Sequence, residues 1–142
     1  MWLIIAAAAA VVWGLNYSLD EKIFELQVSP ATLLAFQAWL GAFLFTILSY
    51  FTTGKTDLAI LSSNRTALWL TIASVIAVTT GIYLIAASIQ AKNATLASLV
   101  EQTYPLFTVL FTYLLFHVHH LTRNVIIGGV MILIGAVIIA LG

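Results

Sequence analysis

The chain has 142 residues, of which 63% are hydrophobic and only 7% are charged, with five basic residues, five acidic residues and no cysteine. A soluble domain carries about 25% charged residues, so the polar side chains here are too few to cover a surface that faces water. The composition predicts an all-α integral membrane protein whose main environment is the lipid bilayer. The lack of cysteine excludes disulfides and thiolate metal sites. A net charge of zero without a basic patch predicts no nucleic-acid partner.

Long uncharged runs between the charged residues set the predicted helices, because a membrane-spanning helix needs about 20 mostly apolar residues. The first run lacks the basic start of a signal peptide and has Trp13 and Tyr17 near its far end, so we expect a retained helix. Pro30 suits the first turn of the second helix. Short loops then join the helices into one domain over residues 1–142. The five expected transmembrane helices are 2–19, 30–52, 66–90, 94–116 and 123–141.

Five helices place the two termini on opposite sides of the membrane. The side of the N-terminus, with the loops near 55–65 and 117–123, has three Lys or Arg residues, and the opposite side has two. The positive-inside rule therefore favours an N-terminus in the cytoplasm, and insertion in both orientations is the alternative. The expected location is the inner membrane of a prokaryotic cell.

Many transporters consist of two inverted repeats that meet at a site near the middle of the bilayer. The chain contains no second copy of its own pattern. One half of such a transporter would be completed by an antiparallel homodimer or by a homologous partner chain.

Polar residues of four predicted helices lie at similar depth. At 1.5 Å per residue, Glu101 lies about 12 Å into the membrane, and Gln37 and Tyr83 lie about 10 Å from the same side. Asn16 is shallower on that side. This convergence predicts a shared binding site.

Two polar stripes support this prediction. Trp13, Asn16 and Tyr17 share one face of the first helix, where they either contact an aromatic or cationic substrate or form an interfacial aromatic belt. On the fourth helix a stripe at three- and four-residue spacing should face protein or a cavity. Its members are Ser98, Glu101, Pro105, Thr108 and Thr112.

Glu101 is the acidic residue inside a predicted span. A carboxylate costs about 2.5–3.5 kcal/mol in a membrane helix, and protonation or a cationic partner reduces this cost. Glu101 is therefore expected to bind a proton and a cationic group in competition, as an antiporter requires. A glutamate that only bonds to its neighbours in a wet vestibule is the alternative. Pro105 removes the hydrogen bond to the carbonyl of Glu101, which predicts a kink there.

Towards the C-terminus, Gly128 and Gly135 predict a helix-packing or dimer seam. The group His117, His119 and His120 has a spacing too loose for a metal site, and we interpret it as interfacial. No metal or cofactor is expected.

Several short motifs together resemble the EamA domains of the drug/metabolite transporter superfamily. The resemblance implies one five-helix half of a transporter that exports metabolites such as amino acids. Gln37 stands near a position where the family often has arginine, so a charge-dependent role is not carried over. The motifs are Trp13-Gly14-Leu15-Asn16-Tyr17, Ala94-Thr95-Leu96-Ala97-Ser98-Leu99, Tyr104-Pro105-Leu106-Phe107, Leu121-Thr122, and the glycines 128 and 135.

The sequence therefore predicts a transporter, with a non-transporting membrane subunit of a larger complex as the alternative. No nucleophile–base pair, HExxH motif or phosphate loop occurs, so we expect no enzyme. The candidate substrate-binding residues are Trp13, Asn16, Tyr17, Gln37, Tyr83, Ser98, Glu101, Gln102, Tyr104 and Pro105.

Overall fold

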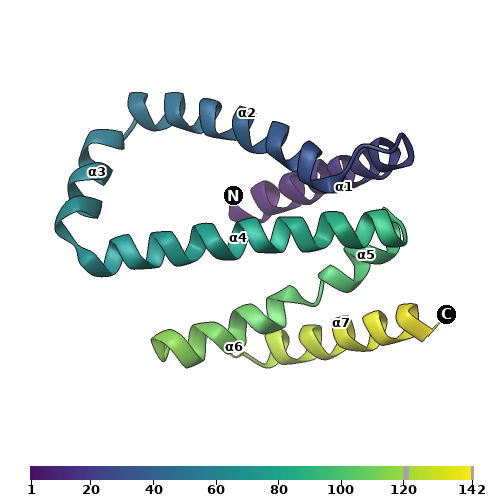
Figure 1. Ribbon diagram of the computed structural model, residues 1–142. Coiled ribbons are helices and arrows are strands. Elements are labelled where there is room, and N and C mark those ends of the chain that lie inside the picture. Colours follow the sequence, from purple (N-terminus) through teal and green to yellow (C-terminus); the bar gives the residue numbers. More distant parts are fainter. Residues whose placement is uncertain (120–121, 142) are drawn as a thin grey trace. The chain divides into compact units, whose positions relative to one another are not determined.

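A computed structural model of the protein describes residues 1–119 and 122–141 (Figure 1). These residues form helices and loops and contain no strand, which confirms the predicted all-α class. The helices are α1 (Trp2–Glu25), α2 (Pro30–Phe51), α3 (Gly54–Ser63), α4 (Arg65–Ala91), α5 (Ala94–Glu101), α6 (Tyr104–Phe116) and α7 (Arg123–Leu141).

Four segments in the described part of the chain are long and apolar enough to cross a membrane. They are α1, α2, α4 and the combined stretch Ala94–Phe116. A shorter apolar stretch, Arg123–Ile139, lies in α7 and corresponds to the fifth predicted span. The helices thus follow the predicted order and fit an integral, multi-pass membrane protein.

The chain divides into two compact units, whose boundaries fall within α1 and α4. One unit comprises Met1–Lys22 and the residues from Ser88 onward, and the other comprises Ile23–Ala87. In the first unit α5 packs against α7, and in the second α2 contacts α3. The first unit therefore contains most of α1 together with the polar stripe around Glu101.

Helix α1 is longer than predicted, and its end is set by Gln27. Gln27 has a left-handed backbone (φ 66°), and its N–H donates to the carbonyl of Phe24 at 3.0 Å. The N–H of Val28 donates to the carbonyl of Ile23 at 3.4 Å, which completes a Schellman-type helix end. The prediction of a loop from residue 20 was therefore wrong. The helix continues through the charged residues because backbone hydrogen bonding, not polarity, ends it.

Helix α3 was also missed, because the sequence predicted a loop near 55–65. Asp57 lies in its first turn, where a negative charge is favourable, and accepts a hydrogen bond of 2.5 Å from the hydroxyl of Thr53. Gly54 begins the helix in a close approach, since a Cβ there would lie 2.8 Å from the carbonyl oxygen of Ser49.

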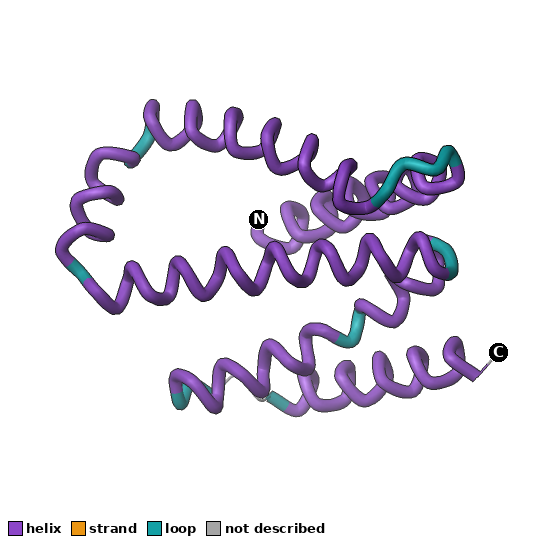
Figure 2. The backbone as a smooth tube through the Cα atoms, in the orientation of Figure 1, coloured by secondary structure: helices purple, strands orange, loops and turns teal. Residues whose placement is uncertain are grey.

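The fourth predicted span is interrupted between α5 and α6. Gln102 and Thr103 form a turn, drawn as a short loop in Figure 2. Their N–H groups donate to the carbonyls of Ser98 and Val100, each at 3.1 Å. Pro105 is the second residue of α6 and cannot donate to Glu101. The predicted kink at Pro105 is confirmed, and it takes the form of a break between two helices.

Helix α6 ends at Phe116 and is capped by His117, another residue with a left-handed backbone (φ 55°). The ring of His119, in the loop after α6, lies 4.9 Å from that of Tyr113 with an angle of 42° between the planes, so this histidine contacts the preceding helix. His120, together with Leu121 and Gly142, lies outside the described residues. Among the described residues no group of three or more histidine, aspartate or glutamate side chains could hold a metal ion.

Candidate functional site

A direct hydrogen bond joins Tyr17 of α1 to Glu101 of α5. The Tyr17 hydroxyl donates to Oε2 of Glu101 at 2.7 Å, across 84 positions of sequence. Both side chains are part-buried, and both belong to the same compact unit. Two residues that were predicted separately from two polar stripes therefore meet in the folded chain.

Trp13 extends this contact along α1. Its ring centroid lies 5.6 Å from that of Tyr17, with an angle of 45° between the planes. Residues four apart lie on one face of a helix, which brings the two rings together. Trp13 is still 49% exposed, so its indole is open to a further partner.

The same face of α1 carries a buried acid that the sequence analysis did not select. Asp20 is only 4% exposed, and its Oδ2 accepts a hydrogen bond of 2.9 Å from the Asn16 amide. Asn16 was predicted to bind substrate, and the structure gives its amide an intramolecular role. Asp20 lies three residues after Tyr17, and this spacing could have identified it if the helix had been extended past residue 19.

A second contact joins α1 to the opposite end of α5. Oε2 of Glu21 accepts a hydrogen bond of 2.7 Å from the main-chain N–H of Ala94. The side chain of Asn93 accepts from the N–H of Leu96, also at 2.7 Å. Two free N–H groups in the first turn of α5 thus receive side-chain acceptors, and the negative Glu21 suits the positive end of the helix dipole.

The two contacts occur in opposite order along α1 and α5. Tyr17 bonds the last residue of α5, and Glu21, one turn further along α1, bonds the first. Helix α5 is therefore held antiparallel to α1 at both ends. This arrangement fixes the position of the Glu101 carboxyl group.

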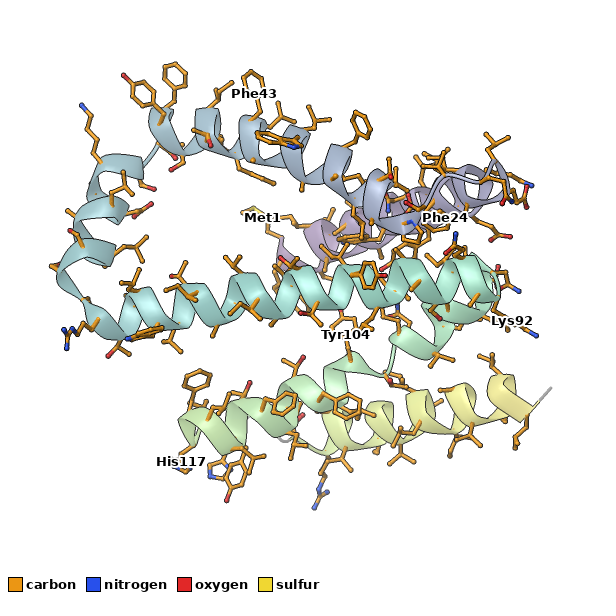
Figure 3. The ribbon with its side chains drawn as sticks, in the orientation of Figure 1. Met1, Phe24, Phe43, Lys92, Tyr104 and His117 are labelled. Carbon is orange, nitrogen blue, oxygen red and sulfur yellow. The ribbon has the colours of Figure 1, made fainter. Side chains whose placement is uncertain are left out.

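Further groups surround the Tyr17 hydroxyl. Asp20 and Tyr104 lie close enough to interact with it electrostatically, in addition to Glu101. Tyr104 starts α6 immediately after the helix break, is 57% exposed, and is labelled in Figure 3. Tyr17 thus interacts with two carboxyl groups and two further aromatic rings. We call this cluster the Tyr17 cluster, and its members are Trp13, Asn16, Tyr17, Asp20, Glu101 and Tyr104.

Glu101 keeps one carboxyl oxygen available. Within the described residues its hydrogen bond is the one from Tyr17 to Oε2, and no basic side chain pairs with it. In addition, the carbonyl of Glu101 lacks its usual i+4 donor, because that donor would be the nitrogen of Pro105. The end of α5 therefore presents an acceptor, Oε1 of Glu101, to which no group of the described residues donates.

The other predicted site residues divide into two groups. Ser98 donates its hydroxyl to the carbonyl of Thr95 at 3.1 Å, while Gln102 and Pro105 form the helix break beside Glu101. Gln37 and Tyr83 belong to the second compact unit. Their convergence with Glu101 stays a prediction.

Comparison with protein families matches residues 1–141 to the EamA-like transporter family. No curated protein and no solved structure matches the chain.

Proposed function

Since the chain belongs to the EamA-like transporter family, and is thus a membrane transporter, we propose that it moves a small metabolite such as an amino acid across the membrane by alternating access. The proposed direction is export from the cytoplasm, across the inner membrane of a prokaryotic cell. Proton uptake by Glu101 drives this export, and the transport unit is an antiparallel homodimer.

The hydrogen bond from Tyr17 to Glu101 is the observation that carries this proposal. A carboxyl group within an apolar helix is costly and marks a functional site by default. Glu101 has one fixed donor, one free oxygen and no basic partner among the described residues. These features suit a group that binds a proton and a substrate in alternation.

The coupling of proton movement to substrate transport follows because the proton and the substrate compete for Glu101. When Glu101 is ionised, the free oxygen attracts a donor from the substrate. When a proton binds, the attraction weakens and the substrate leaves. The break between α5 and α6 supports the cycle, because discontinuous helices line the central sites of many transporters. Helix α5 is held by α1 through the bonds of Tyr17 and Glu21, and in the proposed cycle α6 reorients about Gln102 and Thr103.

Transport into proteoliposomes tests the proposal. We expect an imposed proton gradient to drive flux of at least one metabolite class in the direction opposite to proton flow, and we expect a loss of about tenfold or more in Glu101→Gln, which keeps the shape of the side chain. The matched control is Asp57→Asn, the same change of charge in α3 of the other unit. No flux for any class at any gradient would overturn the proposal. Full flux in Glu101→Gln would favour the non-transporting subunit.

Cysteine cross-linking tests the antiparallel dimer. Two single-cysteine variants, Ile126→Cys near the start of α7 and Ile138→Cys near its end, are produced together. In an antiparallel dimer the cysteine at 126 of one copy should cross-link to the cysteine at 138 of the other. Cross-links only between equivalent positions would show a parallel arrangement and rule out the inverted dimer.

A further inference from the structure

The Tyr17 cluster carries information about the chemistry of its ligand. We propose that it binds an organic ammonium group, so that the transported metabolite is an amine without a carboxylate. This proposal rests on the proposed function and narrows its range of substrates. An amino acid has both an ammonium and a carboxylate group, and the proposal restricts the substrate to amines that lack the carboxylate.

Charge provides the first argument. The carboxyl group of Glu101 bonds the Tyr17 hydroxyl, the carboxyl group of Asp20 interacts with it electrostatically, and no basic side chain is among the groups that interact with this hydroxyl. Nearby like charges in a medium of low dielectric disfavour a further anion and favour a cation. A substrate carboxylate placed here would be repelled, whereas an ammonium group would be attracted.

The free oxygen of Glu101 provides the second argument. Its Oε2 is held by Tyr17, and no group of the described chain bonds its Oε1. An N–H group of an ammonium ion is a strong donor to such an oxygen, since a charged pair shortens and strengthens the hydrogen bond. The Tyr17 bond fixes the carboxyl group, and this lowers the entropy lost when the ligand binds.

Aromatic rings provide the third argument and distinguish an organic cation from a metal ion. Trp13 and Tyr17 form a tilted pair at 5.6 Å, and Trp13 is 49% exposed. The negative face of an aromatic ring attracts an ammonium group, most strongly for tryptophan. The described residues also lack a set of acids or histidines that could hold a metal ion. The combination of rings with a carboxyl group therefore points to an amine.

Three probes with the same ring and chain length test this assignment on the purified full chain. Phenethylamine is the amine, phenylalanine adds a carboxylate, and 3-phenylpropionate replaces the amine by a carboxylate. Isothermal titration calorimetry at neutral pH measures their binding. We expect phenethylamine to bind about tenfold more tightly than phenylalanine, and 3-phenylpropionate not to bind.

Variants then locate the site. Glu101→Gln should weaken phenethylamine binding by about tenfold, and Trp13→Leu by about three- to tenfold. The control is Asp57→Asn, which should bind like the wild type. Circular dichroism and gel filtration confirm that each variant is folded. If a folded Glu101→Gln kept full affinity, or if Trp13→Leu and Asp57→Asn behaved alike, the assignment would be overturned.

The outcomes separate this inference from the proposed function. If the protein binds or transports phenylalanine at least as well as phenethylamine, the ammonium assignment fails and the transporter proposal stands. If phenethylamine binds with the expected dependence on Glu101 but no gradient drives its flux, the binding site stands and proton-coupled transport fails. Absence of phenethylamine binding overturns the assignment directly.

Discussion

The carboxylate of Glu21 accepts a hydrogen bond of 2.7 Å from the main-chain N–H of Ala94, the first residue of α5. The two residues are 73 positions apart, so this contact is tertiary. It lies one turn of α1 from Tyr17, which bonds Glu101 at the other end of α5. Together the two bonds set the register of α5 against α1 and thereby the position of the only acid in that helix.

Removal of the Glu21 carboxylate should therefore destabilise the protein. Glu21→Ala is expected to lower the free energy of unfolding by about 1–2 kcal/mol, because a helix N-terminus loses its side-chain acceptor. Glu21→Gln keeps an acceptor oxygen and should lose less. Unfolding in mixed micelles of mild detergent and dodecyl sulfate, followed by circular dichroism, measures both. An alanine variant as stable as the wild type would show that the contact contributes nothing.

The Tyr17 hydroxyl should matter more for transport than for stability. Tyr17→Phe keeps the ring against Trp13 but loses the bond to Glu101. Flux in proteoliposomes should fall by about tenfold, while the free energy of unfolding changes by less than about 1.5 kcal/mol. Tyr50→Phe in α2 is the control, since the ring of Tyr50 contacts that of its neighbour Phe51. Equal flux in the two variants would refute a functional role for the hydroxyl.

The end of α1 offers a stabilising substitution. An L-residue with a left-handed backbone costs about 1–2 kcal/mol, and glycine avoids this cost. Gln27→Gly should therefore raise the free energy of unfolding by about 1 kcal/mol. Gln27→Ala keeps the Cβ atom, and with it the strain, so it should give no gain. The same unfolding assay compares the two variants, and equal stabilities would argue against strain at this position.

Pro105→Ala should restore a straight fourth span. Alanine supplies the missing N–H to the carbonyl of Glu101, so the turn at Gln102 and Thr103 can become helical. Spin labels at Leu99 and Leu110 should then give a sharper distance distribution centred at about 16 Å. Flux should fall, because the reorientation of α6 is lost.

Proline in a different position provides the control for this experiment. Pro30 begins α2, where a missing N–H costs little. Pro30→Ala should leave flux unchanged. Normal flux in a Pro105→Ala protein whose labels report a straight helix would show that the break is not needed for transport.

Two adjacent glycines of α7 form a matched pair. A Cβ at Gly129 would lie 2.5 Å from Cδ2 of Leu106, whereas a Cβ at Gly128 would meet nothing within 4 Å. Gly129→Ala must displace the leucine side chain and should lower the free energy of unfolding by about 1 kcal/mol. Gly128→Ala should be neutral or stabilising, because alanine favours the helix. Similar losses at both positions would contradict this packing of α6 on α7.

Much of the fold followed from local chemistry. Runs of apolar residues predicted the helices that can span a membrane, and Pro105 predicted the interruption of the fourth. Short helices and true helix ends were less predictable. Asp57 supports α3 through a contact with Thr53, and Gln27 ends α1 through its backbone conformation, neither of which composition reveals.

The candidate site was predicted in part. Trp13, Tyr17 and Glu101 were selected from depth and periodicity, and the structure joins them. Asp20 and Glu21 were assigned to a loop because they are charged, although α1 continues through both.

The sequence by itself determined that the lipid bilayer surrounds this protein, how many apolar segments it has and which residue types are available for chemistry. These properties depend on composition and on distances along one helix. Only the tertiary structure decided which polar groups meet. The bonds from Tyr17 to Glu101 and from Ala94 to Glu21 join residues more than 70 positions apart. Such pairs form only when α1 and α5 pack with one particular register, and that register is set by contacts between helices, which the periodicity of a single helix does not contain.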